Sequence, residues 1–212
     1  MACAGDEVVI IATGIANTAS VEAAFARLGV RVLHTTDPRT VERARALVLP
    51  GVGSFGAGMH VLRRLGLVAV LRERLDAGRA TLAVCLGLQL LCRGSEESRG
   101  IEGLGIIDAI VRRFPDGVPV PQFGWNAVKA PPQAMLVRSG YAYFANSYRL
   151  DAGGAGLADW TTSTSEYAGP FVAAIERGAV LGCQFHPEIS GPWGQALLGR
   201  WLSCSREGVT TC

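Results

Sequence analysis

The sequence has few histidines and no cluster of metal ligands. Only three histidines occur among 212 residues, at His34, His60 and His186, and none of the six cysteines belongs to a Cys-x-x-Cys pair. Zinc sites need closely spaced cysteine and histidine ligands, and disulfide frameworks are typical of short secreted chains. We therefore expect no metal site, no disulfide framework and a reducing cytoplasm. Any chemistry that combines cysteine with histidine must use one of these three histidines.

The chain also lacks an excess of charge and a long apolar run. Its 20 basic and 18 acidic residues give a formal net charge of +2, unlike the basic surface of a nucleic-acid binder. No window approaches the ~18 uninterrupted apolar residues of a membrane span. The apolar run at 8–12 follows Asp6 and Glu7, whereas a secretory signal has basic residues before a longer apolar core. We expect a soluble, cytoplasmic protein that binds neither nucleic acid nor membrane.

The composition, 49% hydrophobic, predicts one domain over residues 1–212 with its core at about 6–204. In the first half, short apolar runs alternate with amphipathic stretches, which indicates parallel strands joined by helical crossovers. The expected strands are 7–12, 30–34, 46–50 and 81–84. The expected helices are 18–28, 38–45 and 57–77, the last one broken near Gly66.

From about residue 105 the pattern becomes rich in β-forming residues punctuated by proline and glycine. Six further strands are expected, at 106–114, 124–128, 141–150, 157–163, 171–176 and 179–184, before a final helix at 194–203. These strands look like antiparallel additions. The predicted fold class is α/β, a three-layer sandwich with a central, mostly parallel sheet and a smaller antiparallel β addition.

A cysteine stands where an apolar strand runs into a helical pattern. Cys85 follows Thr81-Leu82-Ala83-Val84 and precedes Leu86-Gly87-Leu88-Gln89. A strand-to-helix turn projects its side chain from the carboxyl edge of the sheet, and a helix N-terminus favours a thiolate and offers free N–H groups to an oxyanion. The alternative is a small, buried apolar cysteine, the state of most free cysteines. Cys92, which has no such turn, is expected to be structural.

A histidine and a carboxylate follow the last predicted strand, in the sequence Phe185-His186-Pro187-Glu188. Strand ends carry chemistry in open α/β sheets, so His186 would exchange a proton with the thiol and Glu188 would orient the imidazole ring. The alternative is a satisfied histidine at a strand end beside a solvated glutamate. The other two histidines have no carboxylate at so fixed a spacing and are expected to be structural.

A glycine-rich turn, 49–56, follows the third strand and would lie at the same carboxyl edge. Its glycines suit a turn that exposes main-chain N–H groups. No Gly-Lys-Ser or Gly-Lys-Thr follows, so the turn is not a phosphate-binding loop. A tight glycine loop without a ligand is the alternative.

Together these motifs resemble class I glutamine amidotransferases, whose marks are a Pro-Gly-x-Gly turn, a Cys-x-Gly-x-Gln elbow and a Phe-His-Pro-Glu box. Within that family the chain is similar to the glutaminase subunits of imidazole glycerol phosphate synthase, from histidine biosynthesis. The closer similarity rests on residues 47–56, Ser95-Glu96-Glu97, Gly124-Trp125-Asn126 and Tyr143-Phe144 with Ser147-Tyr148. It spans nearly the whole chain.

The resemblance implies a role for each matching residue. Cys85 would be the nucleophile, His186 the base and acid, and Glu188 its orienting partner, in a reaction that passes through a glutamyl thioester and releases ammonia. Backbone N–H groups at the oxyanion site would come from Val52 and Leu86, after a peptide flip at Gly51-Val52. The residues matched to glutamine binding are Gly53, Gln89, Glu97, Asn146, Ser147 and Tyr148.

The resemblance also implies a partner and no cofactor. In this family ammonia passes to a (β/α)₈ cyclase subunit, which forms imidazole glycerol phosphate and an aminoimidazole carboxamide ribotide. Trp125, Asn126 and Asn17 are expected at the interface of such a heterodimer, because aromatic residues are enriched at protein contacts. Core packing is the alternative for Trp125.

Several positions depart from the family pattern without touching the Cys–His–Glu set. The departures are Ala12-Thr13 near the end of the first strand, Gln122-Phe123, Asn146, and Ile189 where the box commonly continues with lysine. A glutaminase is therefore expected, while the ammonia acceptor has an alternative, a different synthase for an amidino sugar or specialised metabolite. Other classes also fit parts of the pattern: a cysteine hydrolase or peptidase without the glutamine contacts, and a binding subunit with a vestigial site.

Overall fold

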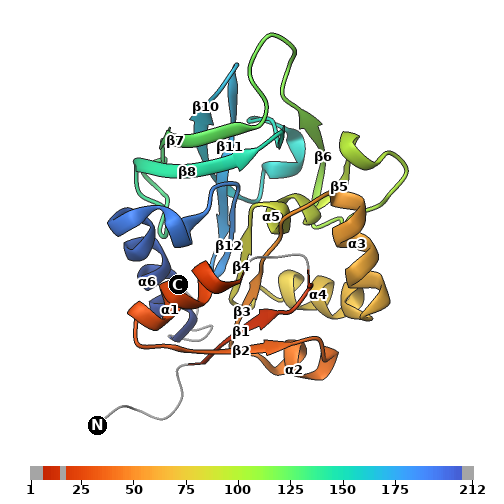
Figure 1. Ribbon diagram of the computed structural model, residues 1–212, viewed down its shortest axis with the longest axis vertical. Helices are drawn as coiled ribbons and strands as arrows, with labels where there is room; N and C mark the ends of the chain where they lie inside the picture. The colour runs from red at the N-terminus through yellow and green to blue at the C-terminus, as the bar shows by residue number, and fades with distance from the viewer. Residues whose placement is uncertain (1–6, 15–17, 207–212) are drawn as a thin grey trace.

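The computed structural model describes residues 7–14 and 18–206, and within them seven strands form a central sheet. The strand order is β10-β11-β12-β4-β3-β1-β2 (Figure 1). These strands are β1 (Glu7–Ile11), β2 (Arg31–Thr35), β3 (Ala46–Leu49), β4 (Thr81–Val84), β10 (Thr161–Glu166), β11 (Pro170–Arg177) and β12 (Val180–Cys183).

The sheet is parallel from β12 to β2 and antiparallel only at the edge that holds β10 and β11. Leu82 of β4 pairs in register with Val48 of β3 and Leu181 of β12. The parallel first half is thus confirmed. The expectation that every later strand is an antiparallel addition was wrong for β12, because the long connection from β4 leaves room for a parallel return. It was also wrong for the strand expected at 106–114, since Ile107–Arg113 pairs in parallel with Cys92–Ser95.

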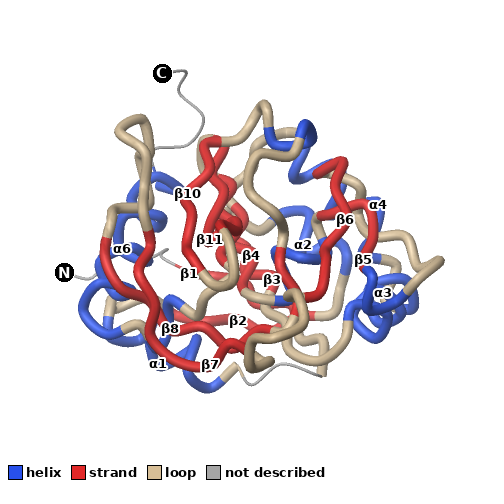
Figure 2. The backbone as a smooth tube through the Cα atoms, turned by 90° about the horizontal axis from the view of Figure 1, so that it is seen from above, coloured by secondary structure: helices blue, strands red, loops and turns tan. Residues whose placement is uncertain are grey.

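Helices cover both faces, so the predicted three-layer sandwich is confirmed (Figure 2). Val8 and Ile10 pack under α1 (Ala19–Arg27) and α6 (Gly191–Arg206), while their neighbours Val9 and Ile11 point to the opposite cluster, as alternation along a strand requires. That opposite face is covered by α2 (Pro38–Arg43), α3 (Phe55–Arg64), α4 (Leu67–Asp76) and the short α5 (Leu86–Leu90). No helix of the described residues is long and apolar enough to cross a membrane.

The helix boundaries follow local capping signals. Ser54 caps α3 by accepting a hydrogen bond from the Ala57 N–H, so the helix begins at Phe55, two residues earlier than predicted. Gly66 adopts a left-handed conformation with φ 68° and separates α3 from α4. The predicted break at Gly66 is therefore confirmed, since glycine adopts this conformation without a Cβ penalty.

The second half adds two small sheets and three 3₁₀ turns. Their elements are β5 (Cys92–Ser95), β6 (Ile107–Arg113) and β9 (Tyr148–Arg149); the hairpin β7 (Gln122–Val128) and β8 (Gly140–Asn146); and η1 (Glu96–Ser98), η2 (Ala155–Leu157) and η3 (Pro187–Ile189). The single strand expected at 141–150 was wrong, because Ser147 divides it between β8 and β9 in different sheets. The strand expected at 157–163 starts instead at Thr161, after η2.

The carboxyl ends of β3, β4 and β12 meet at one edge of the main sheet, and the β7–β8 hairpin lies over this edge (Figure 1). The His186 N–H donates to the Tyr143 carbonyl oxygen at 2.9 Å and so ties the segment after β12 to the hairpin. This edge therefore brings together the three motifs that the sequence places far apart.

Candidate active site

Cys85 lies between the last residue of β4 and the first residue of α5. Its backbone has φ 54° and ψ −108°, a conformation that non-glycine residues rarely adopt and that costs roughly 1–3 kcal/mol. The Cys85 N–H donates to the Cys183 carbonyl oxygen of β12 at 2.7 Å, which holds this strained turn in place. The predicted sharp turn is thus present, with the sulfur at a helix N-terminus whose first N–H groups have no intrahelical acceptor.

Two glycines allow the glycine-rich turn after β3 to pack directly against this elbow. A Cβ atom on Gly87 would lie 2.2 Å from the Leu49 carbonyl oxygen, and one on Gly51 would lie 2.8 Å from the Leu86 Cβ. Neither position has space for a larger residue. The close approach places the two predicted sources of oxyanion N–H groups, Val52 and Leu86, in adjoining segments.

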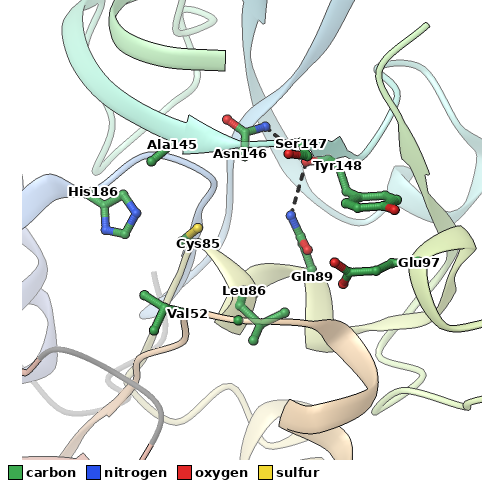
Figure 3. A pocket seen from close by; sticks show the side chains of 11 residues that line it. Val52, Cys85, Leu86, Gln89, Glu97, Ala145, Asn146, Ser147, Tyr148 and His186 are labelled. Carbon is green, nitrogen blue, oxygen red and sulfur yellow. Dashed lines mark hydrogen bonds between the residues drawn. The ribbon is translucent and has the colours of Figure 1, made fainter. Parts of the chain in front are cut away.

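His186 and Glu188 form a close polar pair just after β12. The Nδ1 atom of His186 lies 2.8 Å from Oε1 of Glu188, and both side chains are largely buried. The His186 ring points toward the Cys85 sulfur from across the pocket (Figure 3). The structure therefore brings the three predicted catalytic side chains into one place, with the carboxylate on the ring nitrogen remote from the thiol.

The electrostatics of this arrangement favour a protonated imidazole. Burial lowers the pKa of His186, but its interactions with the Cys85 sulfur and the Glu188 carboxylate outweigh burial and raise the pKa to about 10. An imidazolium between a carboxylate and a sulfur stabilises the thiolate form of that sulfur. The group is thus suited to nucleophilic attack followed by proton delivery to a leaving amine.

A pocket of about 220 Å³ opens in front of the sulfur (Figure 3). It is lined by Val52, Gly53, Cys85, Leu86, Gln89, Glu97, Ala145, Asn146, Ser147, Tyr148 and His186. Every residue matched to glutamine binding lies in this lining. The side chains of three of them already have protein partners. The Glu97 carboxylate accepts from the Phe55 N–H at 2.6 Å, and the Asn146 Nδ2 and the Gln89 Nε2 donate to the Tyr148 carbonyl oxygen at 3.0 Å and 3.1 Å.

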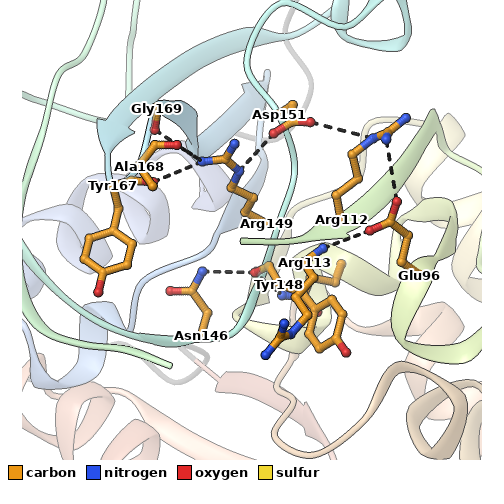
Figure 4. Close-up of polar contacts among 11 residues, drawn as sticks. Glu96, Arg112, Arg113, Asn146, Tyr148, Arg149, Asp151, Tyr167, Ala168 and Gly169 are labelled. Carbon is orange, nitrogen blue, oxygen red and sulfur yellow. Dashed lines mark hydrogen bonds and ion pairs between the residues drawn. The ribbon is translucent and has the colours of Figure 1, made fainter. Parts of the chain in front are cut away.

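Partly exposed ion pairs connect two segments that contribute to the pocket lining (Figure 4). Arg112 contacts both Glu96 at 3.5 Å and Asp151 at 3.7 Å, and Asp151 also contacts Arg149 at 2.9 Å. Glu96 precedes Glu97, and Arg149 follows Tyr148. The network therefore connects the segment that carries the Glu97 carboxylate to the main chain of residues 146–148.

One buried residue at this site carries no role in the sequence interpretation. Gln184 is 0% exposed, and its Nε2 lies 3.7 Å from the Cys85 sulfur. The available signal was a polar residue directly after the apolar run Val180-Leu181-Gly182-Cys183 and two positions before His186. Its partners are distant in sequence, so the pattern alone does not reveal them.

The predicted interface residues have different outcomes. Trp125 is 58% exposed, so the alternative of core packing was wrong, and its ring stacks edge-on against Tyr143 with centroids 6.0 Å apart. The Asn126 Nδ2 donates to the Glu166 carbonyl oxygen at 2.9 Å. Asn17 lies outside the described residues. Exposed Ile189 lines a second cavity of about 160 Å³, which shares Val52 and His186 with the first pocket.

Among the residues that the structure describes, the other cysteine and histidine side chains do not line the pocket. Burial raises the pKa of Cys92 to about 12, which keeps this thiol protonated and inert. His34 pairs with Glu22 at 2.8 Å, and His60 is exposed on α3. Among the described residues no group of three or more His, Cys, Asp or Glu side chains could hold a metal ion.

The geometry agrees with the comparisons with known proteins. Residues 9–203 match the family described as Glutamine amidotransferase class-I. The chain belongs to this family. A solved structure described as a glutamine amidotransferase has a TM-score of 0.74 at 20% identity, covering 95% of this chain and 100% of that one. At that identity the likeness shows the amidotransferase fold alone.

Two relatives have a higher sequence identity to this chain than that solved structure has. "Imidazole glycerol phosphate synthase subunit HisH" of Streptococcus gordonii is 38% identical over 199 residues, which cover 91% of this chain and 94% of the relative. "Imidazole glycerol phosphate synthase hisHF, chloroplastic" of Arabidopsis thaliana is 38% identical over 200 residues. The match covers 92% of this chain but 34% of the plant protein, so the plant protein joins an amidotransferase region to a longer segment.

Proposed function

We propose that this amidotransferase is the glutaminase subunit of imidazole glycerol phosphate synthase, which hydrolyses glutamine and supplies ammonia to a cyclase. The observation that carries the proposal is the Cys85–His186–Glu188 arrangement at the mouth of a pocket whose lining includes every residue matched to glutamine binding. The identity of 38% to a HisH subunit over 91% of the chain supports the choice of this synthase within the family.

In the proposed mechanism the Cys85 thiolate attacks the carboxamide carbon of glutamine. The resulting oxyanion accepts hydrogen bonds from the N–H groups of Leu86 and Val52, each worth about 3 kcal/mol in comparable sites. The His186 imidazolium donates its proton to the leaving nitrogen as the C–N bond breaks, which gives ammonia and a glutamyl thioester. His186 then takes a proton from water as the water attacks the thioester, and glutamate leaves.

The proposed partner is a (β/α)₈ cyclase subunit that uses the ammonia to close the imidazole ring. The plant relative supports this pairing, because a match to the present chain occupies only about a third of its length and a longer segment is covalently attached. The exposed side chains of Trp125, Phe123 and Ile189 lie near the pocket and offer apolar area for such a contact.

The test is reconstitution with the cyclase encoded by the same genome. We expect the mixture to form imidazole glycerol phosphate from glutamine, and the Cys85→Ala variant to lose this activity by at least about 10³-fold, since the nucleophile is gone. The same variant should still support synthesis when ammonium salt replaces glutamine. Cys92→Ala is the matched control, because Cys92 is buried away from the pocket.

Each outcome bears on a different part of the proposal. Glutaminase activity without the imidazole product, with the cyclase active on ammonium, would refute this acceptor and favour another synthase. Absence of Cys85 labelling by the glutamine analogue 6-diazo-5-oxo-norleucine, with the cyclase bound, would refute the glutaminase itself. Loss of ammonium-dependent synthesis in Cys85→Ala would assign that residue a structural role.

A further inference from the structure

The carbonyl oxygen of Tyr148 fixes the orientation of two buried side-chain amides. One of them, that of Gln89, begins a chain of hydrogen bonds that ends at the Cys85 sulfur. It accepts a hydrogen bond from the Gln89 side chain at 3.1 Å and another from Asn146 at 3.0 Å (Figure 3). A main-chain carbonyl oxygen can only accept. The Gln89 atom that faces Tyr148 must therefore be the nitrogen, and its oxygen is left for other contacts.

The orientation of Gln89 determines that of Gln184. The same Gln89 nitrogen lies 3.0 Å from one terminal atom of the Gln184 amide, which must be the oxygen, because two NH₂ groups cannot accept from each other. The Gln184 NH₂ group then faces the Cys85 sulfur, at 3.7 Å. The Gln184 backbone N–H is held by the Ala173 carbonyl oxygen at 2.8 Å, which anchors the residue in the sheet.

We propose that Gln184 stabilises the thiolate of Cys85 by donating an N–H to its sulfur, and that it also holds Gln89 in the orientation that receives glutamine. Gln184 is completely buried, so no water competes for this donor. The Cys85 sulfur then has two different neighbours. The imidazole of His186 exchanges a proton with it, whereas the amide of Gln184 donates a hydrogen bond and keeps its proton. The substrate-related half of this inference rests on the proposed glutaminase function.

The role has chemical consequences that differ between two substitutions. Gln184→Glu keeps the size of the side chain and still accepts from Gln89, but it places an ionisable carboxyl group beside the sulfur. Because that carboxyl group and the thiol then compete for a proton, the thiolate forms at higher pH. Gln184→Met removes both the donor to sulfur and the acceptor for Gln89, whose amide is then free to turn.

The first measurement is the alkylation rate of Cys85 by iodoacetamide between pH 5.5 and 9.5, resolved from the other cysteines by peptide mass spectrometry. We expect Gln184→Met to slow the reaction at pH 7 by about 10-fold and to move its pH midpoint up by about one unit, as loss of a hydrogen bond to a charged acceptor implies. Gln184→Glu should move the midpoint further in the same direction.

The second measurement is steady-state glutamine hydrolysis with the cyclase present. We expect Gln184→Glu to lower kcat with little change in the KM for glutamine, because Gln89 keeps its acceptor. Gln184→Met should lower kcat and also raise KM by several fold. The matched controls are Gln195→Glu and Gln195→Met, since the Gln195 amide is also bonded at both ends, to Ala24 and Arg27, but lies on α6 away from the pocket.

Unchanged alkylation midpoints in folded Gln184→Glu and Gln184→Met would overturn the proposal. If Gln184→Met fails to fold, the nearly isosteric Gln184→Glu decides alone. Alkylation requires neither glutamine nor the cyclase, so a shifted midpoint without any imidazole product would uphold the role at the sulfur while refuting the proposed acceptor. Equal shifts in the Gln195 variants would show a general effect of amide loss and would also overturn the proposal.

Discussion

The two ends of strand β4 carry buried polar clusters that are organised in opposite ways. At the amino end, Arg74 is 2% exposed, and its guanidinium donates to the Thr81 hydroxyl and to main-chain carbonyl oxygens. The carbonyl acceptors belong to Val41, Ala44, Arg45 and Ala80. At the carboxyl end, buried Oε2 of Glu188 and buried Oδ1 of Asn146 have no hydrogen-bond partner among the described residues.

This difference separates a cluster whose guanidinium is fully paired from the proposed catalytic end, where two buried oxygens are unpaired. Burial, followed by repulsion from Arg79, lowers the pKa of Arg74 to about 10, so the guanidinium stays charged at neutral pH. Its donors join α2, the segment between α2 and β3, and β4. Unsatisfied buried polar atoms are unfavourable, and they persist in proteins where function requires them. The same short strand thus has stability at one end and reactivity at the other.

Of the substitutions that compare the two ends of β4, the largest expected effect on activity is at the carboxyl end. Glu188→Gln replaces the carboxylate that orients His186, and we expect glutaminase activity to fall on the order of 10²-fold, as for loss of efficient acid–base catalysis. The loss of an anionic neighbour should also lower the pKa of His186. The pKa is measurable by NMR of labelled histidine, and His34→Gln and His60→Gln identify the remaining signals.

The pH dependence of the free energy of unfolding gives a second test of the interaction between Glu188 and His186. The folded-state pKa of His186 is raised from 6.5 to about 10, so the stabilisation by its proton is fully present below pH 6.5 and is lost as the pH rises through about 10. Urea denaturation should show a smaller loss over this window in Glu188→Gln than in the wild type. An identical loss in both proteins would contradict the assigned interaction of Glu188 with His186.

The next effect tests the amino end. Arg74→Met leaves several buried carbonyl oxygens without donors, and we expect the free energy of unfolding to fall by about 3 kcal/mol or more. Arg74→Lys should recover little of it, because one ammonium cannot reach acceptors spread around a planar guanidinium. Urea denaturation measures the change. The rate of Cys85 alkylation per folded molecule should stay at the wild-type value, and a large fall would show that the two ends are coupled.

The sequence predicts the reactive end better than the structural end. Cys85 stands directly after β4, and His186 and Glu188 come soon after the end of β12. Parallel strands bring their carboxyl ends to one edge, so short motifs suffice to place these residues together. The roles of Arg74 and Gln184 depend on hydrogen-bond partners elsewhere in the sequence, such as Ala44 and Cys85. No local sequence pattern connects these residues to their partners. The division of one expected strand at Ser147 was missed for the same reason, since β8 and β9 are defined by their partners β7 and β6.

The smallest effect concerns a third region, the outer face of the β7–β8 hairpin, which belongs to neither polar cluster. Phe123, 72% exposed, and Trp125 both stack edge-on against Tyr143. Trp125→Ala should weaken cyclase binding by about 10-fold, the change expected for an aromatic contact residue. Titration calorimetry measures this affinity.

The matched control is Leu33→Ala, because Leu33 is an exposed apolar residue on β2, the edge strand opposite β10, and Thr164 of β10 bridges Lys129 just after β7 of the hairpin. Leu33 is an exposed side chain, and Trp125→Ala loses only its edge-on contact with Tyr143, so the free energy of unfolding should fall by no more than about 1.5 kcal/mol in either variant. A cyclase affinity unchanged in Trp125→Ala would remove the hairpin from the proposed interface. A weaker affinity in Leu33→Ala alone would move the interface to the opposite edge, and the reactive end of β4 would then face solvent in the complex.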